Sequence, residues 1–124
     1  MMDQPSMREL VEAVKAFLET RAMPELKGHT AFHARVAANA LGIVARELAT
    51  AETAGAEEME RLKNLLGNQD GTLESLNREL CRRIRSGAFT LGTSGLVEHL
   101  ERTTRDKIAI DQPSYAGFAA NKSK

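Results

Sequence analysis

The 124-residue sequence has one cysteine, three prolines and no tryptophan, so it has few residues that cross-link or stiffen a chain. Its single cysteine, Cys81, excludes a disulfide within the chain and is typical of a reducing compartment. Aromatic residues make up only 4% of the chain, so the core must be aliphatic, which favours helix packing over a β-sandwich. The three prolines lie outside the periodic stretches, where helix ends are expected.

An excess of either charge is also missing, because 17 Lys and Arg residues balance 17 Asp and Glu residues. Proteins that bind nucleic acid usually carry a basic excess, so we expect no nucleic-acid partner. No stretch approaches the ~20 apolar residues of a membrane helix. Residues 1–5 show no cationic stretch that leads into an apolar run. We therefore expect a cytoplasmic protein with no signal peptide and no membrane association.

Apolar residues recur at helical spacing along most of the chain, whose length suits one domain. The pattern predicts an all-α fold, a compact bundle of about five helices. We expect a single domain over residues 1–116 and a disordered tail over residues 117–124. The predicted helices span about 7–22, 31–49, 56–66 and 72–86, and a last one runs from Thr93 or Ser94 to about 110.

Several residues mark where these helices begin and end. Ser6 and Glu9 have the spacing of a capping box, which predicts a helix start. The Met23-Pro24 pair predicts the end of that first helix. Gly67 and Gly87 follow apolar stripes and are natural helix stops. The loop at 88–93 holds Phe89 and Leu91, which we expect to pack beneath it.

Acidic and basic residues repeat at i,i+4 spacing, with the acid first, which is the favourable order on a helix. This repetition predicts that the charges lie on helix surfaces. The pairs are Glu57–Arg61, Glu74–Arg78, Glu79–Arg83, Glu98–Arg102 and Glu101–Arg105.

The common chemical motifs are absent. The sequence has no glycine-rich phosphate loop, no G-x-S-x-G elbow and no helical pair of E-x-x-H motifs. We therefore expect no cofactor and assign no catalytic residue. His29 and His33 have i,i+4 spacing, but a metal ion would need a third ligand, so we expect no metal site.

A few polar residues fall where the helical pattern expects a core. His33 and Glu47 lie inside the apolar arc of the 31–49 helix, and Asn39 lies at its edge. Asn77 falls in the middle of the apolar stripe of the 72–86 helix. The second half of the last helix becomes polar on its inward face, where Thr103 and Thr104 precede two charged residues. The six candidate residues are His33, Asn39, Glu47, Asn77, Lys107 and Asp111.

Two interpretations of these six residues remain open. Burying polar groups without partners costs about 1–3 kcal/mol for a neutral group and several for a charge. The residues therefore form either a polar pocket or recognition surface, or a hydrogen-bonded network that fixes helix register. Glu47 and Asp111 are near helix ends and can instead be solvated, and Lys107 is placed to pair with Asp111. His33 and Glu47 are about 21 Å apart along one helix, too far to form one tight site.

Two further features lie on the 72–86 helix. Arg78, Arg82 and Arg85 project away from the apolar stripe, as a solvated face beside Glu79 or as a contact for an acidic partner. They lack the interleaved aromatic residues of a nucleic-acid surface. Cys81 lies beside the stripe, where we expect a small buried hydrophobic residue rather than a nucleophile.

Three stretches resemble an uncharacterised bacterial family of short helical proteins. They are FHARVAANAL at 32–41 with the apolar residues that follow it, LNRELC at 76–81 and KIAIDQPSY at 107–115. The resemblance extends from about Pro5 to Tyr115. Members of this family are encoded near phosphotransferase-like kinases and acyl-CoA dehydrogenases. The resemblance therefore implies an accessory role in acyl-CoA or aromatic-compound catabolism, with such an enzyme as the partner.

The sequence thus favours a non-catalytic accessory or interaction protein, a homodimer that acts with a partner enzyme. The alternative is a small-ligand-binding module or minor enzyme on the polar face of the 31–49, 72–86 and last helices. In that version Lys107 binds an anionic group and His33 acts as acid or base. Nucleic-acid binding through the arginines of the 72–86 helix ranks last, because the net charge is zero.

Overall fold

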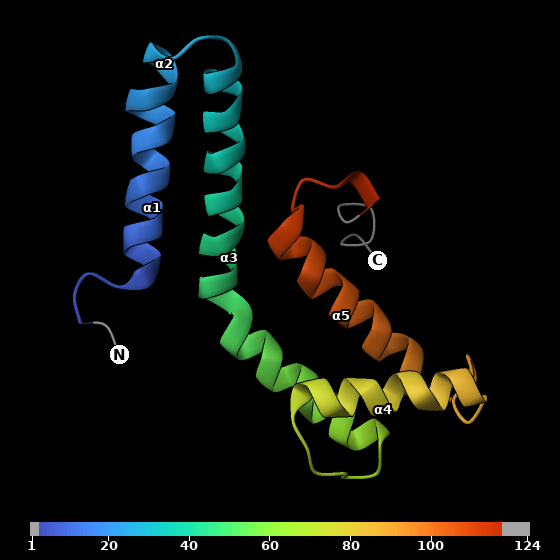
Figure 1. Ribbon diagram of the computed structural model, residues 1–124. Helices are drawn as coiled ribbons and strands as arrows, with labels where there is room; N and C mark the ends of the chain where they lie inside the picture. The colour runs from blue at the N-terminus through green and yellow to red at the C-terminus, as the bar shows by residue number, and fades with distance from the viewer. Residues whose placement is uncertain (1–2, 118–124) are drawn as a thin grey trace. The chain divides into compact units, whose positions relative to one another are not determined.

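The computed structural model describes residues 3–117, and every regular element in that range is helical (Figure 1). The predicted all-α class is confirmed, since none of residues 3–117 lies in a strand. Of the tail predicted over 117–124, residues 118–124 lie outside the described residues. The elements are α1 (Met7–Phe17), the π-helical turn η1 (Leu18–Ala22), α2 (Met23–Glu25), α3 (Gly28–Leu65), α4 (Leu73–Ser86) and α5 (Leu96–Asp111).

The chain divides into two compact units. The N-terminal unit is Met1–Ala51, and the C-terminal unit is Glu52–Lys124. Helix α3 contributes its first part to the N-terminal unit and its last part to the C-terminal unit. Each unit has its own packing.

The first helix begins as the sequence predicts and ends later. The Ser6 hydroxyl accepts from the Glu9 backbone N–H, and the Glu9 carboxylate accepts from the Ser6 N–H, both at 3.2 Å. The predicted end at Met23-Pro24 is wrong, because the chain stays helical through η1 and α2 to Glu25. Pro24 has no N–H and its ring clashes with a regular α-helical turn before it. The wider π turn lies at that place.

The predicted break between the 31–49 and 56–66 helices is also wrong, since both are parts of α3. The segment between them holds no proline, and its one glycine, Gly55, weakens a helix by only about 1 kcal/mol. The Thr50 hydroxyl donates to the Arg46 carbonyl at 2.9 Å, so this polar side chain is satisfied within the helix. Nothing in the segment therefore stops the helical hydrogen-bond pattern.

In the N-terminal unit, α1 and the first part of α3 lie side by side as a helical hairpin (Figure 1). The buried residues of α3 here are small: Ala38, Gly42 and Ala45. A Cβ atom on Gly42 would lie 3.2 Å from the Cε atom of Lys15, so the two helices approach closely at this point. Because small residues fill the contact, the large apolar side chains of the hairpin lie elsewhere.

The C-terminal unit holds the leucine core of the protein. Its buried members come from the end of α3, from α4 and from the start of α5, and each fully buried leucine contributes about 1.5–3 kcal/mol. Three further hydrophobic side chains pack against them partly buried. The buried leucines are Leu62, Leu66, Leu76, Leu80 and Leu96, and the partly buried residues are Met59, Leu73 and Phe89.

The turns of this unit follow the predicted signals. Thr72 caps α4 reciprocally with Ser75, and Gly87 ends α4 with a φ of 84°, a left-handed conformation that glycine adopts without strain. Phe89 packs against the core as predicted. Leu91 is 86% exposed, so its predicted burial is wrong. It lies at the tip of a turn that the Thr93 hydroxyl closes by accepting from the Thr90 N–H at 2.8 Å.

Candidate functional site

Three of the predicted site residues lie in the N-terminal unit, on α3. His33, Asn39 and Glu47 are all exposed. The His33 ring meets the Phe32 ring edge-on, with centroids 5.5 Å apart. Neither His33 nor Glu47 has a hydrogen-bond or ion-pair partner within residues 3–117. Both side chains are therefore available to a molecule outside the hairpin.

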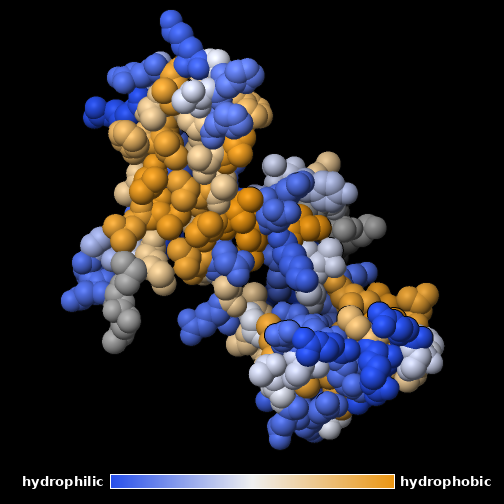
Figure 2. Space-filling view, in the orientation of Figure 1, coloured by the Kyte–Doolittle hydropathy of each residue, from blue (hydrophilic) through white to orange (hydrophobic). Residues whose placement is uncertain are grey.

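These polar residues lie among large apolar side chains that the hairpin leaves exposed. Phe32, for example, is 60% exposed, although its ring is one of the largest apolar groups in the chain. Figure 2 shows apolar side chains gathered over the hairpin. We call this set the apolar surface. It consists of Met7, Leu10, Val14 and Phe17 on α1 and Phe32, Val36, Val44 and Leu48 on α3.

The other three predicted residues lie in the C-terminal unit, and only one is held by its neighbours. The Asn77 amide donates to the Glu58 carboxylate at 3.2 Å and to the Leu73 carbonyl at 3.1 Å. Asn77 is half-buried, and these two bonds satisfy its amide N–H groups, as a structural network requires. Lys107 and Asp111 are exposed, and no ion pair joins them in the part of the chain that the structure describes. Whether any of the six forms a site stays a prediction.

A polar contact that the sequence did not single out lies beside the leucine core. His99 on α5 is only 2% exposed and is the one buried polar side chain among residues 3–117. Its Nδ1 atom accepts from Arg61 Nε at 3.1 Å, so the neutral ring carries its proton on Nε2. Burial lowers the pKa of His99, and the nearby Arg61 charge lowers it further. The imidazole is therefore held neutral.

Arg61 reaches this histidine from α3 and has an unusual set of partners. Its second hydrogen bond goes to the Thr103 hydroxyl at 3.2 Å, so both of its partners are neutral. No carboxylate lies within ion-pair distance of Arg61 in residues 3–117, and the predicted pair with Glu57 does not form. Glu57 instead accepts from Arg102 at 3.0 Å. Arg61 is thus a half-buried cation that has no carboxylate partner among residues 3–117.

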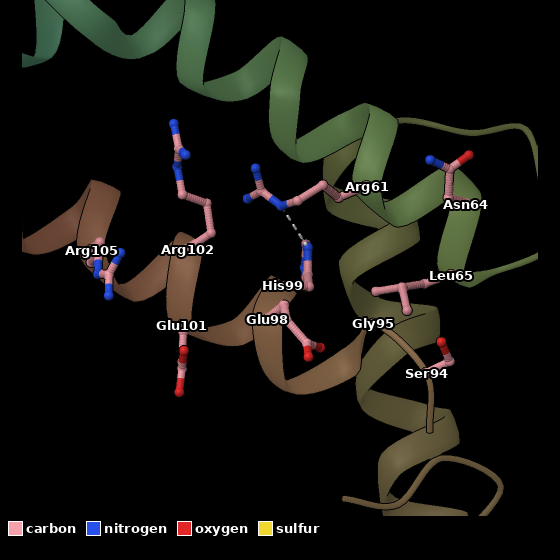
Figure 3. A pocket seen from close by; sticks show the side chains of 10 residues that line it. All are labelled: Arg61, Asn64, Leu65, Ser94, Gly95, Glu98, His99, Glu101, Arg102 and Arg105. Atoms are coloured by element: carbon pink, nitrogen blue, oxygen red, sulfur yellow. Dashed lines mark hydrogen bonds between the residues drawn. The ribbon is translucent and has the colours of Figure 1, made fainter. Parts of the chain in front are cut away.

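An open pocket of about 730 Å³ surrounds this contact. Figure 3 shows Arg61 and Arg102 extending into the space between α3 and α5, whereas Glu98 and Glu101 point away from it. Arg102 also donates to Asp106 at 3.2 Å. The pocket lining holds three arginines and two glutamates, and its size is within the roughly 300–1,000 Å³ of small-molecule sites.

One signal for His99 was present in the sequence. His99 follows Leu96 by three residues, which places it on the buried side of α5. The polar inward face predicted from Thr103 onward therefore begins one turn earlier, at His99. The sequence places Arg61 on a helix, but i,i+4 spacing predicts only partners on the same helix. It therefore could not predict the hydrogen bond from Arg61 on α3 to His99 on α5.

Two other expectations concern metal ions and cysteine chemistry. Within residues 3–117, no group of three histidine, cysteine or acidic side chains is placed to hold a metal ion. Cys81 is exposed, so its predicted burial is wrong. It follows the buried Leu80 by one residue, and this turns its thiol out of the core.

No described helix is long and apolar enough to cross a membrane.

The comparisons with known proteins identify a family and give no relative of known activity. Residues 24–115 match the family described as Domain of unknown function (DUF6285). Comparison with curated proteins and with solved structures finds no match. The matched range covers α3, α4 and α5 and includes all six predicted site residues.

Proposed function

The chain belongs to the family described as Domain of unknown function (DUF6285), and we propose that it is a non-catalytic interaction protein that binds through its N-terminal hairpin. The apolar surface carries this proposal. Its eight large side chains are each 39–60% exposed. Contiguous exposed apolar surface of this kind marks interaction sites in proteins.

The size of the apolar surface fits a protein interface. If about half of each side chain is exposed, α1 and α3 together present on the order of several hundred Å² of apolar surface. Each partner of a standard interface buries about 800 Å². The hairpin also buries only small residues of α3 in its own contact, so its stability gains from association.

The partner classes come from the family resemblance. We propose that this chain acts with a phosphotransferase-like kinase or an acyl-CoA dehydrogenase. We also propose that it associates with itself. His33 and Glu47 would then give specificity, because polar groups within an apolar interface reject partners that leave them unpaired.

Co-purification tests this proposal. The full chain is co-expressed with a tagged enzyme of each class, and the bound fraction is compared with that of Val14→Asp. Thr20→Asp is the matched control, because Thr20 is exposed on the next helical segment and its hydroxyl bonds only to the Ala16 carbonyl. We expect Val14→Asp to lose the enzyme and Thr20→Asp to keep it. Equal capture by both variants, or no association of any kind by the wild-type chain, contradicts the proposal.

A second candidate function is supported by Arg61. A half-buried guanidinium with only neutral partners favours an anion as its missing partner, since a bidentate carboxylate or phosphate matches its fork of donors. This gives the ligand-binding alternative a location at the Arg61–His99 pocket, where Lys107 is not a lining residue. The ligand would be a small organic anion.

The histidine signals of the protein provide a direct test of this second function. His99 lines the pocket, whereas His29 and His33 lie in the N-terminal unit and serve as internal references. In NMR titrations with phenyl phosphate and with benzoate at constant pH, we expect a saturable shift of the His99 ring alone. Arg61→Gln should abolish it, and Arg85→Gln, an exposed arginine of the same unit, should not. If neither anion moves the His99 signal, the pocket is not an anion site.

A further inference from the structure

The large apolar residues that α3 exposes in the N-terminal unit follow a single row. They are four residues apart, and an exposed alanine fills the one gap in the series. We call this set the outer row: Phe32, Val36, Ala40, Val44 and Leu48. Residues four apart form a continuous ridge on a helix, and this ridge is the one used in the commonest mode of helix packing.

The outer row lies on the side of α3 that α1 does not cover. At about 100° per residue, Ala40 is roughly opposite the buried Ala38, Gly42 and Ala45, which form the contact with α1. The ridge is therefore open along its whole length within the hairpin. Its occupant must come from outside the hairpin.

The outer row has a symmetry that points to its occupant. Phe32 and Leu48 are equally far from Ala40, and so are Val36 and Val44. In an antiparallel pair of identical helices with a two-fold axis at Ala40, each apolar residue faces an apolar residue of the other copy. Such a self-complementary patch is the requirement for a two-fold interface.

The polar residues on the same face obey the same symmetry. His33 and Glu47 are each about 10 Å along the helix from Ala40, on opposite sides. In the antiparallel pair, His33 of one copy therefore faces Glu47 of the other. Both side chains are exposed and have no hydrogen-bond partner within residues 3–117. The imidazole and the carboxylate are complementary groups, so the pairing satisfies both within an otherwise apolar contact.

The sizes of the side chains also fit this arrangement. Packing of such ridges crosses two helices at a steep angle, so the axes are closest at the crossing point and diverge from it. The small Ala40 lies at the crossing point, where space is least. Phe32 and Leu48 lie at the ends, where long side chains are needed to keep contact.

We propose that the outer row of α3 binds the outer row of a second copy of this chain, antiparallel and centred on Ala40, with His33 of each copy beside Glu47 of the other. This inference rests on the proposed function, in that it names the first partner of the interaction surface. The apolar stripe of α1 is not part of this contact and stays available for an enzyme.

A disulfide at the symmetry point tests the register. In a Cys81→Ser background, Ala40→Cys places two thiols across the two-fold axis, and Arg35→Cys places one on an exposed position off the row. Under mild oxidation of the full chain at micromolar concentration, we expect Ala40→Cys to form a covalent dimer at least about tenfold faster than Arg35→Cys. Equal rates overturn the register.

A charge swap tests the polar pairing. His33→Glu sets two carboxylates against each other and is expected to weaken the dimer by at least about tenfold. Adding Glu47→Lys to the same chain restores an opposite-charge contact and is expected to recover most of the lost affinity. Circular dichroism of every variant shows that the helices are retained. If the double variant is as weak as His33→Glu alone, the pairing is wrong.

The outcomes separate this inference from the proposed function. A wild-type dimer without the Ala40 cross-link overturns the register, while the proposal of an interaction surface stands. A wild-type monomer that still binds a co-expressed enzyme shows that a second copy does not bind the outer row, while the proposed interaction surface stands. A monomer that binds neither enzyme overturns both.

Discussion

Replacing His99 by glutamine tests whether the C-terminal unit is built around a buried, neutral imidazole. His99 is 2% exposed and accepts from Arg61 Nε through Nδ1. Glutamine keeps an acceptor for Arg61 but does not titrate. The His99→Gln variant therefore removes the proton-binding group and retains a hydrogen-bond acceptor beside the half-buried guanidinium.

The sign of the effect follows from the direction of the pKa shift. Burial and the Arg61 charge lower the pKa of His99 below its ordinary value of 6.5 in the folded protein. Below that pH the unfolded chain binds a proton that the folded chain does not. The free energy of unfolding therefore falls as the pH drops through about 6.5 and levels off below the folded pKa. One histidine gives a slope of at most about 1.4 kcal/mol per pH unit.

Urea unfolding at several pH values between about 5 and 8 measures this slope. We expect wild type to lose stability toward the acidic end and His99→Gln to lose less over the same range. His29→Gln is the matched control, because His29 is exposed in the N-terminal unit and lies outside the proposed contact between copies. A wild-type stability that is flat or rises between pH 7.5 and 5.5 would refute the burial of a neutral His99.

Three further substitutions test other parts of the structure. Leu76→Ala removes a fully buried core side chain and should lower the free energy of unfolding by about 2–5 kcal/mol in urea, whereas Leu91→Ala, at an 86% exposed position, should change it by less than about 0.5 kcal/mol. Thr72→Ala removes the cap of α4 and should cost about 1 kcal/mol in the same assay. Val44→Asp should leave helix content unchanged but weaken self-association by about 100-fold or more, measured by analytical ultracentrifugation, because an unpaired buried charge costs about 3–5 kcal/mol.

Local signals explain why much of the fold was predictable. The Ser6 capping box, the Gly87 stop and the stripes of α4 and α5 depend on residues within a few positions of each other, and the structure confirms them. The prediction of a helix break near residue 50 is wrong for a related reason. A cluster of small and polar residues resembles a turn, but without proline or a competing cap the helix continues.

Contacts between helices account for the features that the sequence did not predict. Arg61 had a suitable acid four residues earlier, yet in the structure it reaches α5 and bonds to His99 and Thr103. Asn77 was visible as a polar residue in an apolar stripe, but only the structure shows that Glu58 satisfies it. A helical wheel identifies such misplaced polar residues and does not reveal which helix lies opposite them.

The exposure of His33 and Glu47 has a similar origin. Their position inside an apolar arc predicted a core, and the structure shows that this arc is an exposed side of α3. Periodicity identifies the face of a helix that prefers burial. It does not tell whether a neighbouring helix of the same chain or another molecule provides the cover.

Native mass spectrometry of the full wild-type chain beside Val36→Asp tests the central claim most directly. Ala49→Asp, an exposed position of α3 outside the apolar surface, is the control. We expect a dimer for wild type and for Ala49→Asp, and a monomer for Val36→Asp. A dimer for all three proteins would contradict the claim that the chain associates with a second copy through the apolar surface of the hairpin.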